Sequence, residues 1–113
     1  MRDDRERLRD ILEAIARIEK YTANGRDVFD SDELVQVWVL RHVQIIGEAS
    51  RTLSPEFRAQ HAEIQWSEMI GTRHILVHRY FGIDDDLVWE IVERDLPELK
   101  RAVTDIVQEK EDD

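Results

Sequence analysis

Residues 30 to 53, DSDELVQVWVLRHVQIIGEASRTL, decide the fold of this chain. Asp30, with Glu33 three residues later, has the form of a capping box and predicts the start of a helix that runs to about Leu53. Apolar side chains occupy more than one face of this helix: Leu34, Val35, Val37, Trp38, Val39, Leu40, Val43, Ile45, Ile46 and Ala49. Such a wide apolar surface needs contacts on two sides, so we expect it at the centre of a helical bundle or at a dimer interface.

Helical patterns flank this stretch on both sides. From Asp3 to Ala23, apolar residues recur at steps of three and four, and Asn24-Gly25 predicts the end of that helix. Ser54-Pro55 predicts a short helix through Gln60. A third long helix is expected from Trp66 to about Val77.

The last helix is expected to begin at the acidic run Asp84-Asp85-Asp86, which suits the positive end of a helix dipole. Pro97 predicts a kink near Arg94 to Leu96, because proline donates no backbone hydrogen bond. No segment has the alternation of a strand. The sequence therefore predicts one all-α domain over residues 1 to 113, an antiparallel bundle of four main helices plus a short one, with a frayed acidic tail at residues 109 to 113.

The composition excludes several classes of function. The chain of 113 residues has no cysteine, which removes disulfides, thiol catalysis and metal sites built on cysteine. The first six residues are charged, and no apolar run approaches the roughly 18 residues of a membrane span. We expect a soluble, cytoplasmic protein with no membrane partner, and a domain of this size gains stability by self-association.

Charge is distributed unevenly along the chain. The net charge of −10 argues against general binding of nucleic acid, which depends on lysine and arginine. Residues 84 to 113 carry 4 basic and 12 acidic side chains, which form either a solvated helix face or a surface for a basic partner. Residues 69 to 83 contain no Asp or Glu at all. This acid-free segment is the part of the chain that suits an anion.

The acid-free segment contains the stretch TRHILVHRYF, residues 72 to 81. Its histidines can exchange protons near neutral pH, its arginines offer a planar set of donors to phosphate, and its tyrosine presents a hydroxyl. These groups suffice for phosphate-ester chemistry without a metal. His74 and His78 are spaced for a shared metal on a helix, but no third ligand pattern accompanies them, so we expect no metal and no other cofactor.

Arg73 and His78 cannot meet on one regular helix. Five residues at 100° per residue place them about 140° apart. Either the helix ends near Val77 and the chain turns His78 back toward Arg73, or the site is shared across a two-fold axis.

The pattern Arg-x4-His-x-Tyr, formed by Arg73, His78 and Tyr80, resembles the signature of HepT-like toxins of the HEPN superfamily. His74 takes the place of a polar residue that is most often Asn in that group. The resemblance extends over most of the chain, through Ile45-Ile46-Gly47-Glu48-Ala49, Trp66 and the last helix as far as Leu96-Pro97.

This resemblance implies a dimer in which two motifs meet in a cleft and form a metal-independent endoribonuclease. Arg73 and His78 are then the catalytic residues, with His74, Glu48 and Arg79 in supporting positions. Glu48 is either a partner of Arg73 or a histidine, or a solvated side chain, and Arg79 is a solvated neighbour or an RNA contact. Tyr80 corresponds to the tyrosine that a partner nucleotidyltransferase antitoxin modifies with AMP, within a larger hetero-oligomer.

A second function of a different class stays open. The chain is then a non-catalytic subunit that binds substrate for a small nucleotidyltransferase or regulates it. The acidic net charge favours this alternative, whereas the intact Arg73, His78 and Tyr80 favour the ribonuclease.

Overall fold

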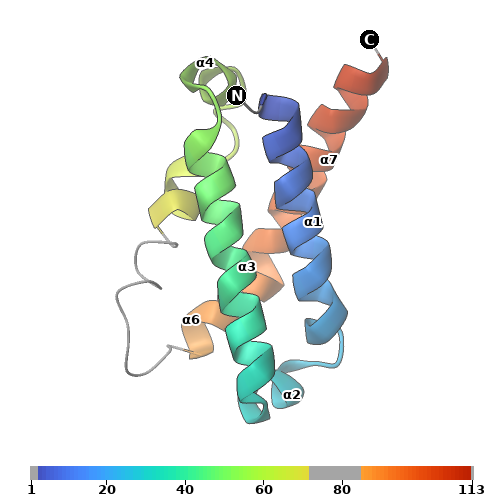
Figure 1. The fold of residues 1–113 in the computed structure, drawn as a ribbon, viewed down its shortest axis with the longest axis vertical. Helices are drawn as coiled ribbons and strands as arrows, with labels where there is room; N and C mark the ends of the chain where they lie inside the picture. Colours follow the sequence, from blue (N-terminus) through green and yellow to red (C-terminus); the bar gives the residue numbers. More distant parts are fainter. Residues whose placement is uncertain (1–2, 72–84, 113) are drawn as a thin grey trace.

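The computed structural model describes residues 3 to 71 and 85 to 112, and all its regular structure in those ranges is helical (Figure 1). The prediction of an all-α fold is therefore confirmed. The elements are α1 (Asp4–Thr22), α2 (Arg26–Ser31), α3 (Glu33–Thr52), α4 (Pro55–Gln60), α6 (Asp85–Glu90), a π-helical segment η1 (Ile91–Asp95) and α7 (Leu96–Asp112). Residues 66 to 71 are also helical and begin the third long helix of the sequence prediction.

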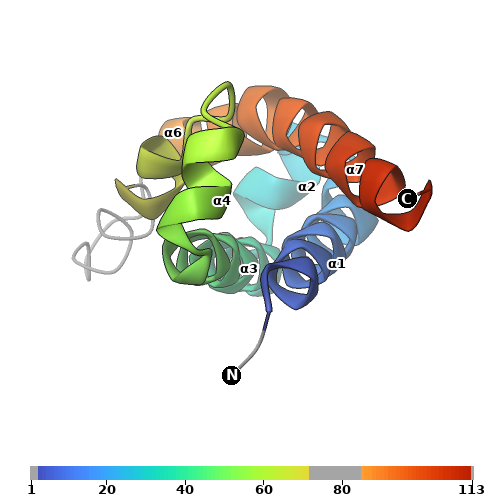
Figure 2. The ribbon, with the colours of Figure 1, turned by 90° about the horizontal axis from the view of Figure 1, so that it is seen from above.

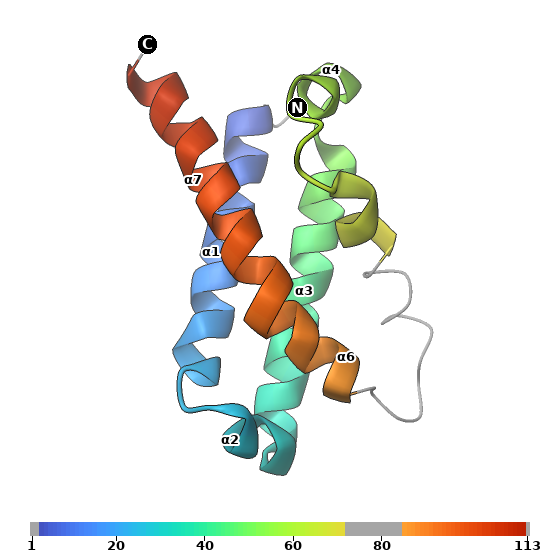
Figure 3. The same ribbon diagram turned by 180° about the vertical axis from the view of Figure 1, so that it is seen from behind.

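The long helices α1 and α3 lie side by side and antiparallel, and α7 crosses behind them (Figures 1 and 3). Seen from above, α1, α3, α4 and α7 surround a common centre, which α2 closes at the far end (Figure 2). The apolar residues with no measurable exposure come from several of these helices and belong to one core: Leu8, Ile11, Ile18, Phe29, Val39, Val88 and Val103.

Side-chain caps explain where α1 and α4 begin, and the one at Ser54 was predicted. The Asp3 carboxylate accepts a hydrogen bond from the backbone N–H of Glu6, and the Ser54 hydroxyl accepts one from the N–H of Phe57. The Asp4 carboxylate in turn accepts bonds from the N–H and the hydroxyl of Ser54, at 2.9 and 2.7 Å. The start of α1 is thus fastened to the start of α4, 50 residues away.

The start of α3 corrects one prediction. Asp32, not Asp30, caps this helix, and its carboxylate accepts bonds from the N–H groups of Leu34 and Val35. Asp30 belongs to the short helix α2, where it pairs with Arg26. The predicted link between the first two long helices is therefore itself helical, because Phe29 buries its ring in the core and holds this turn in place.

The disturbance predicted near Pro97 takes the form of the π-helical turn Ile91–Asp95. The N–H of Leu96 bonds the carbonyl of Ile91, five residues back instead of four. The last helix therefore continues through this turn and does not break. Buried residues are spaced three or four apart on either side, but five apart across the turn, from Ile91 to Leu96.

None of the helices in residues 3 to 71 and 85 to 112 is long and apolar enough to span a bilayer. Helix α7 extends to Asp112, so the fraying expected from residue 109 stays a prediction.

Candidate functional site

The candidate catalytic residues lie in one short segment of the chain. Arg73, His74, His78, Arg79 and Tyr80 fall within residues 72 to 84, outside the described residues. Their convergence and their contacts stay predictions. The structure does describe the helices that lead into and out of this segment, and these define its two attachment points.

The leading attachment is aromatic. Trp66 begins the helix over residues 66 to 71, is only 5% exposed and donates its indole N–H to the carbonyl of His61 at 3.1 Å. Its ring lies 6.1 Å from that of Phe57 on α4, and the Phe57 ring contacts the imidazole of His61 at 4.6 Å. Met69, one turn later, is also buried. The helix that enters the candidate segment is therefore fixed to the core. Trp66 is therefore a core anchor, as expected for a tryptophan that is a core or interface residue.

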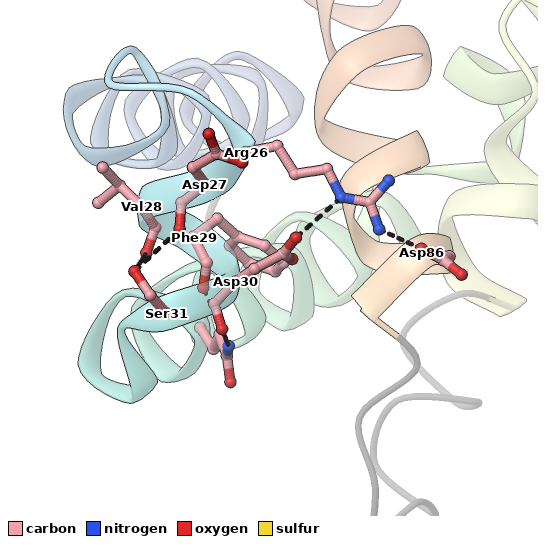
Figure 4. Close-up of polar contacts among 8 residues, drawn as sticks. Arg26, Asp27, Val28, Phe29, Asp30, Ser31 and Asp86 are labelled. Carbon is pink, nitrogen blue, oxygen red and sulfur yellow. Dashed lines mark hydrogen bonds and ion pairs between the residues drawn. The ribbon is translucent and has the colours of Figure 1, made fainter.

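The trailing attachment joins α6 to α2. Arg26 on α2 reaches across to the carboxylate of Asp86 in the first turn of α6, and it also bonds Asp30 at 3.2 Å (Figure 4). The hydrogen bond that Arg26 donates to the Asp86 carboxylate is the main reason that the pKa of Arg26 is raised. The same two helices are also joined by Phe29 and Trp89, whose ring centroids lie 5.4 Å apart. The helices before and after the candidate segment are thus both fixed to the rest of the domain by described side-chain contacts.

Glu48, a predicted supporting residue, lies on α3 with a side chain that is 41% exposed. It accepts two hydrogen bonds from Arg51, the shorter at 2.5 Å, and this pairing raises the pKa of the Arg51 guanidinium. The neighbouring Gly47 is buried, as close helix packing requires. The interaction of Glu48 with Arg73 or a histidine stays a prediction.

Carboxylates gather beside the leading attachment. A cavity of about 180 Å³ lies between residues 63 to 69 and the last helix, and Glu63, Glu68, Asp95 and Glu98 contribute to its lining. Burial is the main cause that raises the pKa of Asp95, and repulsion from Glu68 and Glu90 adds to it. These carboxylates make the surface beside the leading attachment negative, so it repels anions. Within residues 3 to 71 and 85 to 112, no group of three or more His, Asp or Glu side chains is arranged to hold a metal ion.

One buried histidine was not singled out from the sequence. His42 on α3 is 7% exposed, and its Nδ1 lies 2.7 Å from the carbonyl oxygen of Trp38. Because a carbonyl only accepts, Nδ1 carries the proton. Its ring also packs on the indole of Trp38, 4.4 Å away. His42 follows Trp38 by four residues inside an apolar helix, and this spacing could have indicated from the sequence that the histidine packs on the indole.

Comparison with known proteins places the chain in a family. The family model described as "Ribonuclease HepT-like" matches residues 11 to 106. The chain is 40% identical over 103 residues to a "Putative RNase" of Methanocaldococcus jannaschii, covering 90% of this chain and 94% of that protein. It is 41% identical to a "Probable ribonuclease HepT" of Thermococcus cleftensis, covering 88% of this chain and 91% of the relative.

This chain corresponds to only part of a longer relative. A protein of M. jannaschii named "Gamma-glutamylcyclotransferase and putative RNase" is 42% identical over 103 residues, but the chain spans only 46% of its length. No solved structure matches the chain significantly. The family match and the relatives of similar length agree with each other. The chain belongs to the ribonuclease HepT-like family, within the HEPN superfamily.

Proposed function

We propose that this chain is the toxin of a toxin–antitoxin pair, a metal-independent endoribonuclease that works as a homodimer. The observation that carries the proposal is the family match over residues 11 to 106, combined with the presence of Arg73, His78 and Tyr80 inside that range. The substrate is RNA, since the proposed reaction uses the 2′-hydroxyl that DNA lacks.

The proposed reaction needs proton carriers and a cation. One histidine takes the proton of the 2′-hydroxyl while that oxygen attacks the adjacent phosphorus. The bond from phosphorus to the 5′-oxygen breaks, and a second histidine gives a proton to that leaving oxygen. Arg73 stabilises the charge on the phosphorane. A dimer supplies two copies of His78 for the two proton transfers. Because the 2′-oxygen attacks and the 5′-oxygen leaves, the products are a 2′,3′-cyclic phosphate and a 5′-hydroxyl end.

The described scaffold supports this assignment in two ways. Trp66 and the pair formed by Arg26 and Asp86 fix the helices at either end of the segment, so the motif is attached to a packed core. The acid-free residues 69 to 83 also provide a local exception to the net charge of −10. In a protein with this charge, RNA binding depends on such a restricted surface.

We further propose that a nucleotidyltransferase antitoxin silences the enzyme by joining AMP to the Tyr80 hydroxyl, as part of a cytoplasmic hetero-oligomer. The added phosphate brings negative charge and bulk to the motif. Both effects exclude an RNA backbone from the same place. Tyr80 is two residues from His78, so the modification acts where the proton transfer takes place.

The alternative function is a non-catalytic subunit of the nucleotidyltransferase, which the acidic net charge favours. A neighbouring nucleotidyltransferase gene agrees with both readings and cannot separate them. Expression of this chain alone can, because only a ribonuclease toxin arrests growth and degrades RNA without its partner.

The decisive variant in that experiment is His78→Ala. Loss of a general acid or base lowers a rate by about 10² to 10⁴, so growth arrest and RNA cleavage should disappear. Gln108→Ala is the control, because Gln108 is exposed on α7, outside the motif and its two attachments, and the variant should leave cleavage intact. Circular dichroism verifies that both variants fold. Wild-type protein that binds the nucleotidyltransferase but neither arrests growth nor cleaves RNA would support the alternative.

A further inference from the structure

An open groove lies between α1 and α3, the two long helices that run side by side (Figure 1). Its volume is about 400 Å³, which is within the range of roughly 300 to 1,000 Å³ that is usual for ligand sites. Both helices contribute to its lining, which consists of Asp10, Glu13, Ala14, Arg17, His42 and Ile45. The groove is therefore built entirely from described residues.

His42 brings an unused hydrogen-bond acceptor to this groove. The side chain is only 7% exposed, and its Nδ1–H donates to the carbonyl of Trp38 at 2.7 Å. In the neutral imidazole the other ring nitrogen, Nε2, is then an acceptor. Nε2 forms no hydrogen bond with any residue in the described ranges, yet it is not enclosed by protein. A polar atom on a side chain that is almost fully buried usually has a partner, and here the partner has to come from outside the domain.

The position of this acceptor is fixed before any ligand arrives. The indole of Trp38 packs against the His42 ring, with the ring centroids 4.4 Å apart. Trp38 in turn donates its indole N–H to the carbonyl of Arg17 on α1 at 2.8 Å, and its ring meets that of Tyr21 at 5.3 Å. The imidazole therefore cannot turn without disturbing contacts with both helices. A preorganised acceptor of this kind loses little conformational freedom on binding.

The charged residues of the groove favour a ligand that is a cation with several N–H donors. Glu13 accepts two hydrogen bonds from Arg17, at 3.0 and 3.3 Å, and both reach the same oxygen, Oε1. The second oxygen, Oε2, accepts no hydrogen bond from the described part of the chain. Asp10 adds another carboxylate, so negative groups outnumber positive ones in the lining. The groove therefore attracts cations and repels anions.

The apolar surface in and beside the groove indicates that this cation belongs to a protein. Ala14 and Ile45 line the groove, and the aliphatic stem of a lysine or arginine packs on such residues while its charged end reaches polar groups. Leu34 lies four residues before Trp38 on the same side of α3 and is 81% exposed. An exposed leucine next to the groove suits contact with a protein better than contact with a free amine.

We propose that the groove between α1 and α3 binds a lysine or arginine side chain of a partner protein. His42 Nε2 accepts one of the N–H groups of this side chain, and the Glu13 carboxylate faces its positive charge. The inference does not depend on the proposed ribonuclease activity, because none of the residues involved belongs to the motif or to its two attachments.

The first test observes Nε2 directly by nitrogen-15 NMR of the full chain with labelled histidine. At about pH 8, where ordinary histidines are neutral, N-acetyl-arginine amide should shift the His42 Nε2 resonance upfield, because an imidazole nitrogen that accepts a hydrogen bond becomes more shielded. N-acetyl-citrulline amide is the matched control ligand, since it has nearly the same shape without the charge. It should bind about tenfold more weakly, because hydrogen bonds that involve a charged group are stronger.

Three results of this titration would overturn the proposal. Equal binding of the two compounds would show that the charge is not recognised. No shift with either compound would mean that the groove holds only water. A shift caused by spermidine or by a single-stranded RNA oligonucleotide, but not by the arginine compound, would assign the groove to a free amine or to RNA instead of a protein.

The second test changes the charge of the groove in both directions. Glu13→Gln should weaken binding of the arginine compound by about fivefold, and Arg17→Gln should strengthen it by a similar factor, because it removes a like charge. A damaged fold would not strengthen binding. Glu93→Gln is the matched control, since it removes the same charge from an exposed position of η1, outside the groove, and should leave affinity unchanged.

The variant His42→Phe keeps a ring against Trp38 but removes both nitrogens. It should abolish binding, and the loss of its resonance assigns the Nε2 signal. Circular dichroism checks that it folds, and if it does not, the two charge variants decide the matter. Affinities that fail to move in opposite directions for Glu13→Gln and Arg17→Gln would contradict the assigned site.

Discussion

The contact of Phe29 with the core gives the most direct test of how α2 holds the helix that follows the candidate segment. Phe29 has no exposed surface, and its ring meets Trp89 in α6 at 5.4 Å. Phe29→Ala removes a buried ring and leaves a cavity, which costs about 3 to 5 kcal/mol. Since small domains have a free energy of unfolding of about 5 to 15 kcal/mol, this is a large share of the total.

Urea denaturation followed by tryptophan fluorescence measures this loss. With a slope of about 1.5 kcal/mol per molar urea, a loss of about 4 kcal/mol lowers the midpoint by about 2.7 M. Val28→Ala is the matched control. Val28 is the neighbour of Phe29 in the same helix but is 36% exposed, so its truncation should change the free energy of unfolding by less than about 1 kcal/mol. Protein concentration is kept constant, since dimerisation shifts the midpoint. A loss below about 1 kcal/mol for Phe29→Ala, with an unchanged slope, would refute the role of this ring.

Three further outcomes are expected. RNA cleavage should survive EDTA and yield 2′,3′-cyclic phosphate ends, and activity that is lost on chelation and restored by Mg²⁺ would contradict the metal-independent mechanism. Tyr80→Phe should keep cleavage yet resist silencing, and AMP found on this variant by intact mass after incubation with the nucleotidyltransferase and ATP would exclude Tyr80 as the acceptor. Asp95→Asn should raise the thermal midpoint at pH 7. The pKa of Asp95 in the folded state lies above its ordinary value of 3.8, so the folded state becomes less stable as pH rises and Asp95 ionises. The gain should vanish below about pH 3.8, where Asp95 is protonated in both states, and a lower midpoint of the Asn variant at pH 7 would contradict this account.

The long helices could be predicted from the sequence because each buries one apolar stripe with a period near 3.6 residues. The short helix α2 could not, since only Phe29 of its six residues is buried and a single apolar residue has no period. The same ambiguity affected the cap of α3. Asp30 and Asp32 are both good capping residues, and only the packing of Phe29 decides that the new helix starts after Asp32.

The candidate site was predicted as a set of residues and not as a geometry. The types of side chain at positions 73, 78 and 80 follow from the sequence, and so does the angle that prevents Arg73 and His78 from meeting on one straight helix. The trailing attachment did not follow from it. The pair formed by Arg26 and Asp86 joins residues 60 positions apart, and no local pattern indicates such a contact.

The π-helical turn Ile91–Asp95 has a consequence for aligning this chain with its relatives. The turn adds one residue to the helix while keeping Ile91 and Leu96 on the same inward side. An ordinary α-helix would place residue 95 there, and in this chain that residue is the carboxylate Asp95. A relative whose last helix lacks the turn therefore aligns with a one-residue gap between Ile91 and Leu96. An ungapped alignment would instead rotate all of α7 by about 100° and assign its core positions to the wrong residues.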